Sequence, residues 1–170
     1  AMVSVICNNA LNRSVREFRL SNPGDILNNT KKLVIQEFEK SEKDVNDGMD
    51  IALCCLEGNR LSYSGANNPL WIYKKNELIE YKADKQPIGN YRLEKPFSTH
   101  EITLEKEDVF YLLSDGYADQ FGGEKGKKYK TINLKNFLLS IHEEPMVKQK
   151  KLLEREFEIW KGEYDQIDDV

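Results

Sequence analysis

Between residues 49 and 114 the sequence consists of short apolar or alternating runs separated by turn residues, and helical patterns lie on both sides of this region. Such runs are typical of antiparallel strands joined by short loops. We predict tight turns at Glu57-Gly58-Asn59 and at Lys75-Asn76. The six predicted strands cover residues 49–57, 60–66, 70–74, 77–83, 97–105 and 108–114.

Two helices are predicted before the strands and two after them. Residues 1–18 have apolar side chains at helical spacing but no capping residue, so this helix is expected to begin before residue 1. In the second helix, over residues 21–40, Asn22 is the expected cap and Pro23 lies in the first turn. Further helices are expected over residues 133–143 and 145–160. This order favours an α+β fold, with antiparallel β sheets flanked by helices, over alternating βαβ units.

Composition excludes several classes of protein. The 170 residues suit one domain, and 39% hydrophobic with 32% charged residues is a globular profile. The net charge of −4 gives no general attraction to nucleic acid. No apolar run approaches the roughly 20 residues that cross a bilayer, so no membrane contact is expected from this chain. The three cysteines lack the spacing of a metal site or a disulfide framework, which favours a reducing, cytoplasmic setting. A longer parent protein with a membrane-anchored sensor is compatible with this setting.

A carboxylate ends one of the most apolar runs. Val109 to Leu113 is apolar on both faces and is expected to be a central strand, which places Asp115 at the end of a buried element. Asp119 should lie one helical turn further on. Two interpretations are open here: an ordinary turn in which Ser114 or Asp115 caps the next helix, or a site for a hard cation, which prefers oxygen ligands.

The C-terminal residues repeat this pattern, since Asp168 and Asp169 border what is predicted to be the start of a last strand. A solvated acidic end is the alternative. The two histidines, His100 and His142, lie outside any acid-base motif and are expected at solvated positions.

Four segments in order, "LSYSGANNPLWIY", "KADKQPIG", "LLSDGYADQFGG" and "DDV", resemble the metal-dependent Ser/Thr protein phosphatases, the PPM or type 2C family, and most of all its bacterial SpoIIE-like branch. The resemblance implies a PPM-phosphatase-like α/β sandwich of antiparallel sheets. It also implies two Mn²⁺ or Mg²⁺ ions at one end of the sheets, which activate water for attack on phosphorus.

Residue by residue, Asp115 and Asp168 are similar to metal-binding aspartates of the family. Asp169 would be a neighbour of the ligands. Asp119 matches a position that in some relatives helps to hold a weaker third ion, and Asn67 lies near where some relatives have another acid for that ion.

One family segment, an Asp-x-Thr-Gly-His-Gly-like run, would lie just before Ala1 and is absent. Residues 1–170 are therefore expected to form a single partial phosphatase domain, truncated at both ends and inactive alone. The two ions are expected in the intact domain, and this fragment is expected to bind metal more weakly or not at all. By analogy, the parent dephosphorylates a phosphorylated regulatory protein of the anti-sigma-factor antagonist type. The alternative is a non-catalytic protein-interaction module on the same scaffold. A third hypothesis is a carbohydrate- or lipid-binding domain with Trp71 and Trp160 as aromatic platforms. It ranks below the other two because these tryptophans lie at the spacing of core residues.

Two further expectations concern partners. Lys127 and Lys128 lie in the only dense basic run, which is either a solvated loop or a surface that attracts a phosphorylated protein substrate. Strands missing ahead of Ala1 would leave an open sheet edge, so a homodimer through such edges is expected.

Overall fold

The structure is a computed structural model that describes residues 2–40, 48–75, 77–89 and 95–170. The chain forms two compact units, one of residues 1–70 with 80–106 and the other of residues 71–79 with 107–170. The predicted turn residue Asn76 lies outside the described residues. That residues 1–170 form a single partial domain stays a prediction.

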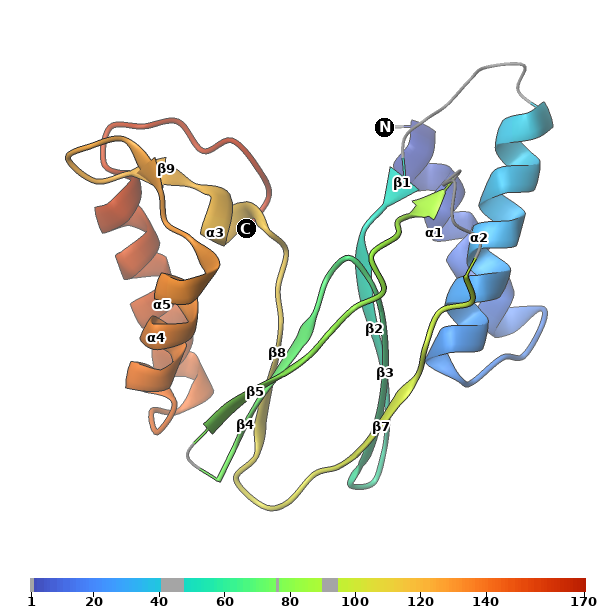
Figure 1. The fold of residues 1–170 in the computed structure, drawn as a ribbon, viewed down its shortest axis with the longest axis horizontal. Helices are drawn as coiled ribbons and strands as arrows, with labels where there is room; N and C mark the ends of the chain where they lie inside the picture. Colours follow the sequence, from blue (N-terminus) through green and yellow to red (C-terminus); the bar gives the residue numbers. More distant parts are fainter. Residues whose placement is uncertain (1, 41–47, 76, 90–94) are drawn as a thin grey trace. The chain divides into compact units, whose positions relative to one another are not determined.

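The first unit begins with two helices that lie side by side, α1 (Met2–Arg16) and α2 (Pro23–Lys40) (Figure 1). The predicted cap of α2 is confirmed, because the Asn22 Oδ1 accepts a hydrogen bond of 3.2 Å from the Asp25 N–H. Between the helices, the buried hydroxyls of Ser14 and Thr30 lie 3.0 Å apart and share a hydrogen bond. Leu27 and Val34 of α2 are fully buried in the core of this unit.

The first unit also contains a three-stranded sheet in the order β2-β3-β7. Its strands are β2 (Ile51–Glu57), β3 (Arg60–Ala66) and β7 (His100–Thr103), and both pairings are antiparallel. Glu57 pairs with Arg60, so the hairpin turn is Gly58-Asn59, with Gly58 at a φ of 61° as a tight turn requires. A second antiparallel pair joins β1 (Gly48–Met49) to β6 (Ile88–Gly89).

The second unit combines a sheet in the order β5-β4-β8 with three helices. The strands of this sheet are β4 (Leu70–Lys74), β5 (Glu77–Tyr81) and β8 (Val109–Leu112). After β8 come α3 (Gly116–Asp119), the antiparallel pair β9 (Phe121–Gly122) and β10 (Lys127–Lys128), α4 (Thr131–Ile141) and α5 (Met146–Lys161). Trp71 packs with Leu134 and Leu138 of α4 and with Phe157 of α5 in one core.

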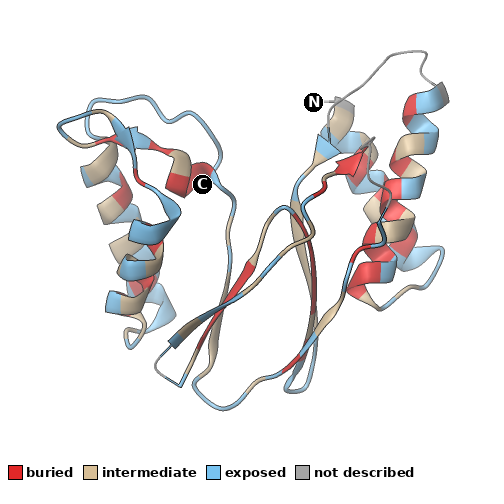
Figure 2. Cartoon of the chain, in the orientation of Figure 1, coloured by how far each residue is buried: buried red, intermediate tan, exposed pale blue. Residues whose placement is uncertain are grey.

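Two expectations about strands are wrong. The structure places β8 at an edge of its sheet, and Leu112 is 42% exposed; the buried strand is β4, from Leu70 to Tyr73. An apolar run cannot by itself distinguish a central strand from an edge strand. Residues 164–170 form no strand, and every residue from 162 to 170 is exposed (Figure 2).

Candidate metal centre

Asp115 lies in the turn between β8 and α3, as the sequence predicts. The Asp119 N–H donates a hydrogen bond of 2.9 Å to the Asp115 carbonyl oxygen, which closes the single turn of α3. Asp115 occupies the N-cap position, but its side chain makes no capping hydrogen bond and is exposed. The capping interpretation and the expected burial of this acid are therefore both wrong, since β8 ends at the surface of its unit.

The C-terminal tail lies against this turn. The Ser114 hydroxyl donates a hydrogen bond of 2.8 Å to the Asp169 carbonyl oxygen. A Cβ on Gly116 would overlap the Asp169 carbonyl, with the carbonyl carbon at 3.0 Å, and would lie 3.4 Å from the Asp168 Cβ. Only a glycine allows the tail to approach α3 this closely. The structure thus brings Asp168 next to Gly116, the residue that follows Asp115, although the tail and this turn are far apart in sequence.

The tail is also held by bonds of its own. The Asp169 N–H donates a hydrogen bond of 2.8 Å to Asp168 Oδ1, and Gln166 Nε2 donates one of 2.8 Å to the Asp168 carbonyl oxygen. Further back, the buried Gln120 uses its Nε2 to donate to the Asp165 carbonyl oxygen at 2.9 Å. These bonds fix the path of the tail past α3 and position the Asp168 carboxylate.

Asp119, the third predicted acid, is engaged by a cation of the protein. Lys128 Nζ lies 2.8 Å from Asp119 Oδ2, and each side chain is nearly half exposed. The basic run therefore does not form a loop that is only solvated. Its neighbour Lys127 is exposed and pairs with Gly122 in the β9–β10 ladder.

The residues present fit part of a divalent-cation site. Asp115 and Asp168 supply carboxylate oxygens, which Mg²⁺ and Mn²⁺ prefer, and neither carboxylate forms an ion pair in the described part of the chain. Among the described residues, no group of three acid, histidine or cysteine side chains could hold a metal ion. That Asp115, Asp168 and Asp119 bind metal and that Asp169 supports them stay predictions.

Sequence reasoning missed two contacts that shape this centre, Ser114 to Asp169 and Lys128 to Asp119. Both join residues on opposite sides of a turn or in distant segments, and the sequence contains no periodic signal for either. The sequence signal that could have indicated the β9–β10 hairpin is the glycines of "FGGEKGKKY". In the structure Gly123 and Gly126 both have positive φ, as residues of hairpin turns often do.

The histidines and tryptophans pack against other side chains of the protein. His100 is half-buried and stacks on Tyr63 with ring centroids 5.8 Å apart, and the half-buried His142 lies 3.9 Å from the Tyr73 ring, so the expected solvated positions are wrong. Trp71 is 4% exposed in the core, and Trp160 Nε1 donates to the Gln120 carbonyl oxygen at 3.0 Å. The two tryptophans therefore do not form an aromatic binding platform.

Burial perturbs phenols next to the centre. Tyr117, the residue after Gly116, donates its hydroxyl to the Leu153 carbonyl oxygen at 2.9 Å. Burial, followed by the nearby Tyr129 and Glu156, raises the pKa of Tyr117 well above its ordinary value. Burial, a hydrogen bond to Glu156 and its charge also raise the pKa of Tyr129. Both phenols are therefore neutral near pH 7 and act as packing and hydrogen-bonding groups.

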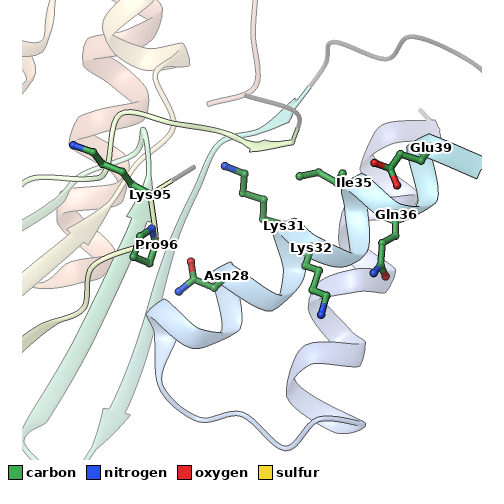
Figure 3. Close-up of a pocket in the computed structure, with 8 residues that line it drawn as sticks. All are labelled: Asn28, Lys31, Lys32, Ile35, Gln36, Glu39, Lys95 and Pro96. Atoms are coloured by element: carbon green, nitrogen blue, oxygen red, sulfur yellow. The ribbon is translucent and has the colours of Figure 1, made fainter. Parts of the chain in front are cut away.

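Asp115, Asp119 and Asp168 line neither of the two larger cavities formed by the described residues. In the first unit, a groove of about 360 Å³ follows α2, and its lining includes Lys31, Lys32 and Lys95. Figure 3 shows the Lys32 ammonium group directed away from those of Lys31 and Lys95, and Lys31 Nζ donates a hydrogen bond of 2.9 Å to Gln86 Oε1, so the three lysines define no single anion site. In the second unit, a cavity of about 510 Å³ is lined mainly by apolar side chains of β8, α3 and α5 and by Val170.

Comparison with family models gives one match, to stage II sporulation protein E (SpoIIE), over residues 1–170. The chain belongs to the SpoIIE family. No curated protein sequence matches this member of the family. The fold is that of PP2C-type protein phosphatase domains.

Solved structures support the fold assignment of this SpoIIE-family chain. The SiaA-PP2C domain of Pseudomonas aeruginosa is similar with a TM-score of 0.87 and 23% identity, over 99% of this chain and 66% of that chain. The SpoIIE phosphatase domain of Bacillus subtilis, in a structure presoaked with Mn, is similar with a TM-score of 0.55 and 15% identity, over 95% of this chain and 67% of that chain. The Ser/Thr phosphatase PstP of Mycobacterium tuberculosis is similar with a TM-score of 0.53 and 15% identity, over 93% of this chain and 79% of that chain.

The SpoIIE-family chain thus spans 66% of the SiaA domain structure. The predicted α+β fold of helices and antiparallel sheets is confirmed by these neighbours. None of the helices in the described part of the chain combines the length and the apolar character that crossing a membrane requires.

Proposed function

We propose that this chain is part of a metal-dependent phosphoserine/phosphothreonine protein phosphatase domain. The observation that carries the proposal is the packing of Asp168 against Gly116, which puts two exposed carboxylates without ion pairs beside the α3 turn. Membership of the SpoIIE family supports the same chemistry. Asp115 and Asp168 would hold Mn²⁺ or Mg²⁺, with Asp169 beside them.

When bound, these ions supply Lewis-acid activation of water and of the phosphoryl group. The residues of the chain provide the framework for that chemistry. Ser114 and Gly116 hold the tail that carries Asp168 against the turn that carries Asp115. The exposed Lys127 provides a positive charge on the same unit that attracts a phosphorylated protein and raises the rate of encounter more than the final affinity.

The substrate we propose is a phosphorylated regulatory protein, of the kind that antagonises an anti-sigma factor. We propose further that the 170-residue chain alone is inactive, because among its described residues no group of three acid, histidine or cysteine side chains could hold a metal ion. Both proposals rest on the family resemblance and on the length of the chain relative to the SiaA domain.

The test compares the chain with the product of a reading frame extended upstream. With Mn²⁺ and a phosphoserine or phosphothreonine peptide, the chain alone should turn over well below roughly 1 s⁻¹. The extended protein should be active and should lose activity in Asp115→Asn and Asp168→Asn. Asp165→Asn, on the same tail, is the matched control and should retain activity.

The competing function, a non-catalytic interaction module, makes a different prediction. The extended reading frame would then contain no acid-bearing Thr-Gly-His-Gly-like segment. The extended protein would bind its partner without hydrolysing phosphate. Such a result would overturn the enzymatic proposal.

A further inference from the structure

The groove of about 360 Å³ in the first unit has the dimensions of a short peptide segment. One side of it is α2, and the other side is formed by Lys95 and Pro96 (Figure 3). The lining residues of α2 recur three or four positions apart from Asn28 to Glu39, so they form one stripe of the helix. At about 1.5 Å per residue this stripe is roughly 16 Å long, which is the span of about five residues of extended chain.

A buried polar bridge holds the two sides of this groove together. Lys31 of α2 is 8% exposed, and its Nζ donates a hydrogen bond of 2.9 Å to Oε1 of Gln86, which is 4% exposed. Gln86 Nε2 donates in turn to the Lys95 carbonyl oxygen at 2.8 Å. The Phe97 N–H donates to Asn28 Oδ1, also at 2.8 Å. Because buried polar groups destabilise a protein unless they are hydrogen-bonded, these bonds keep both sides in place, and the groove is preformed.

The groove is basic, although the chain as a whole carries a net charge of −4. Its lining contains three lysines against one acid, Glu39. Two of the lysines, Lys32 and Lys95, are exposed and form no ion pair in the part of the chain that the structure describes. The half-buried Ile35 adds an apolar side chain to the same lining. Surfaces of opposite charge attract, so this lining suits a segment with several acidic side chains and an apolar one.

The directions of the lysines favour a row of acids over one small anion. The Lys32 ammonium is directed away from those of Lys31 and Lys95, so no single phosphate reaches all three (Figure 3). Lys31 already donates to Gln86. Acidic side chains at separate positions of an extended segment reach Lys32 and Lys95 independently.

We propose that this groove is a docking site for an acidic, extended segment of a protein partner. Lys32 and Lys95 attract the segment, and Ile35 contacts its apolar side chain. Lys31 and Gln86 are positioning residues, which lower the cost of binding because the groove is ordered beforehand. The groove belongs to the first unit, whereas the candidate metal-binding acids belong to the second, so the proposal holds whether or not the chain hydrolyses phosphate esters.

Lys82 offers a matched control in the same unit. It is exposed like Lys32 and Lys95, does not line the groove, and forms no ion pair among the described residues. Replacing any of the three lysines by glutamine removes one positive charge from the first unit. A difference between the variants therefore reports the groove rather than net charge.

The experiment measures the fluorescence anisotropy of a fluorescein-labelled peptide, Glu-Glu-Leu-Asp-Glu, titrated with the full 170-residue chain at low ionic strength. The uncharged peptide Gln-Gln-Leu-Asn-Gln has the same shape and should bind much more weakly. Lys32→Gln and Lys95→Gln should each raise the Kd of the acidic peptide about two- to fivefold, and the double variant about tenfold, as for exposed ion pairs. Lys82→Gln should bind the acidic peptide like the unmodified chain.

A variant of Gln86 separates positioning from charge. Gln86→Met keeps every charge of the groove but removes the bridge between Lys31 and the Lys95 carbonyl oxygen. Its Kd should rise, while the slope of log Kd against log salt concentration should stay that of the unmodified chain. In Lys95→Gln this slope should become smaller, because one attraction that salt screens is lost. Circular dichroism confirms that each variant is folded.

Several results would overturn the proposal. One is equal binding of the acidic peptide by Lys82→Gln and by the double variant of Lys32 and Lys95, and another is equal binding of the acidic and the uncharged peptide. Displacement of the peptide by an equal concentration of inorganic phosphate would make the occupant a single anion. Tighter binding of phosphatidylserine–phosphatidylcholine vesicles through the same two lysines would make it a lipid surface.

Discussion

The Ser114 hydroxyl donates a hydrogen bond of 2.8 Å to the carbonyl oxygen of Asp169. This bond joins the turn that carries Asp115 to the tail that carries Asp168. The alignment of the two candidate ligands therefore depends on a contact between side chain and backbone at an exposed position. The first two predictions follow from this dependence.

Replacing Ser114 by alanine should loosen the tail without unfolding the chain. A hydrogen bond of this kind contributes about 0.5–1.5 kcal/mol, so Mn²⁺ affinity should fall by about two- to tenfold. Hydrogen exchange of residues 165–170 should become faster. Ser140→Ala, which removes an exposed hydroxyl bonded to the Phe137 carbonyl oxygen, is the control and should change neither quantity. Unchanged exchange in Ser114→Ala would contradict the role of this bond.

Replacing Gly116 by alanine should displace the tail more strongly. The added Cβ would overlap the Asp169 carbonyl, and the exposed tail can move more easily than the buried α3. Overpacking of this kind costs about 1–3 kcal/mol, but we expect most of it to appear as loss of the tail contact. Mn²⁺ binding should drop to the level of Asp168→Asn, with global stability to urea nearly retained. Full Mn²⁺ binding by Gly116→Ala would show that the tail does not need this approach.

Stability should decline at alkaline pH. The pKa of Tyr117 is raised on folding, so its contribution is fully present below the unfolded pKa of about 10 and is lost as pH rises above it. Cys54 behaves similarly, since burial and then Cys55 raise its pKa to about 11. Its contribution should be lost between about pH 9 and pH 11.

Urea unfolding at pH 8, 9.5 and 10.5 measures this effect. Each such group adds at most about 1.4 kcal/mol per pH unit to the slope. Tyr117→Phe should reduce the slope of the unfolding free energy against pH at the highest pH. At pH 8 it should lower the unfolding free energy by about 1 kcal/mol, because the substitution removes the hydrogen bond to the Leu153 carbonyl oxygen. A slope equal to that of the unmodified chain would mean that Tyr117 ionises normally.

Neutralising Lys127 and Lys128 together should weaken recognition of a phosphorylated protein. In the extended, active protein, kcat/KM should fall severalfold and depend less on salt, because screened attraction acts mainly on the rate of encounter. Lys151→Gln, an exposed lysine of α5, serves as the control. An unchanged salt dependence in the double variant would exclude a role for the hairpin in recognition.

The chain should self-associate through the edge of β8. Leu112 is 42% exposed on this edge strand, and open edges recruit further strands. Light scattering should show a dimer at high concentration, and Leu112→Lys should shift it toward monomer. Ile132→Lys, at a 59% exposed position of α4, should leave the dimer intact. A constant monomer mass across a wide range of concentration would contradict the prediction.

Much of the fold could be predicted because its signals are local. Asn22 caps α2 as expected, the predicted turn at Gly58 joins β2 to β3, and Asp119 lies one turn after Asp115. Each depends on residues within a few positions of one another. Periodicity and turn chemistry act on that scale.

What could not be predicted depends on distant segments. Whether Leu112 is buried depends on which strands lie beside β8, and its own run does not encode them. The two-residue strands are too short to carry an alternating pattern. The Lys128 contact with Asp119 follows from how the β9–β10 hairpin folds back, so the sequence suggested a metal ligand and a basic patch separately.

The exposed tail beside α3 has a consequence for the stability of the C-terminal segment. A cation held by both Asp115 and Asp168 would join points about fifty residues apart and close that length into a loop. Closing a long loop removes entropy mainly from the unfolded chain, so the ion would act as a clasp. Divalent ions would then protect residues 162–170 from proteases, and chelation would release this segment before any other part of the unit unfolds.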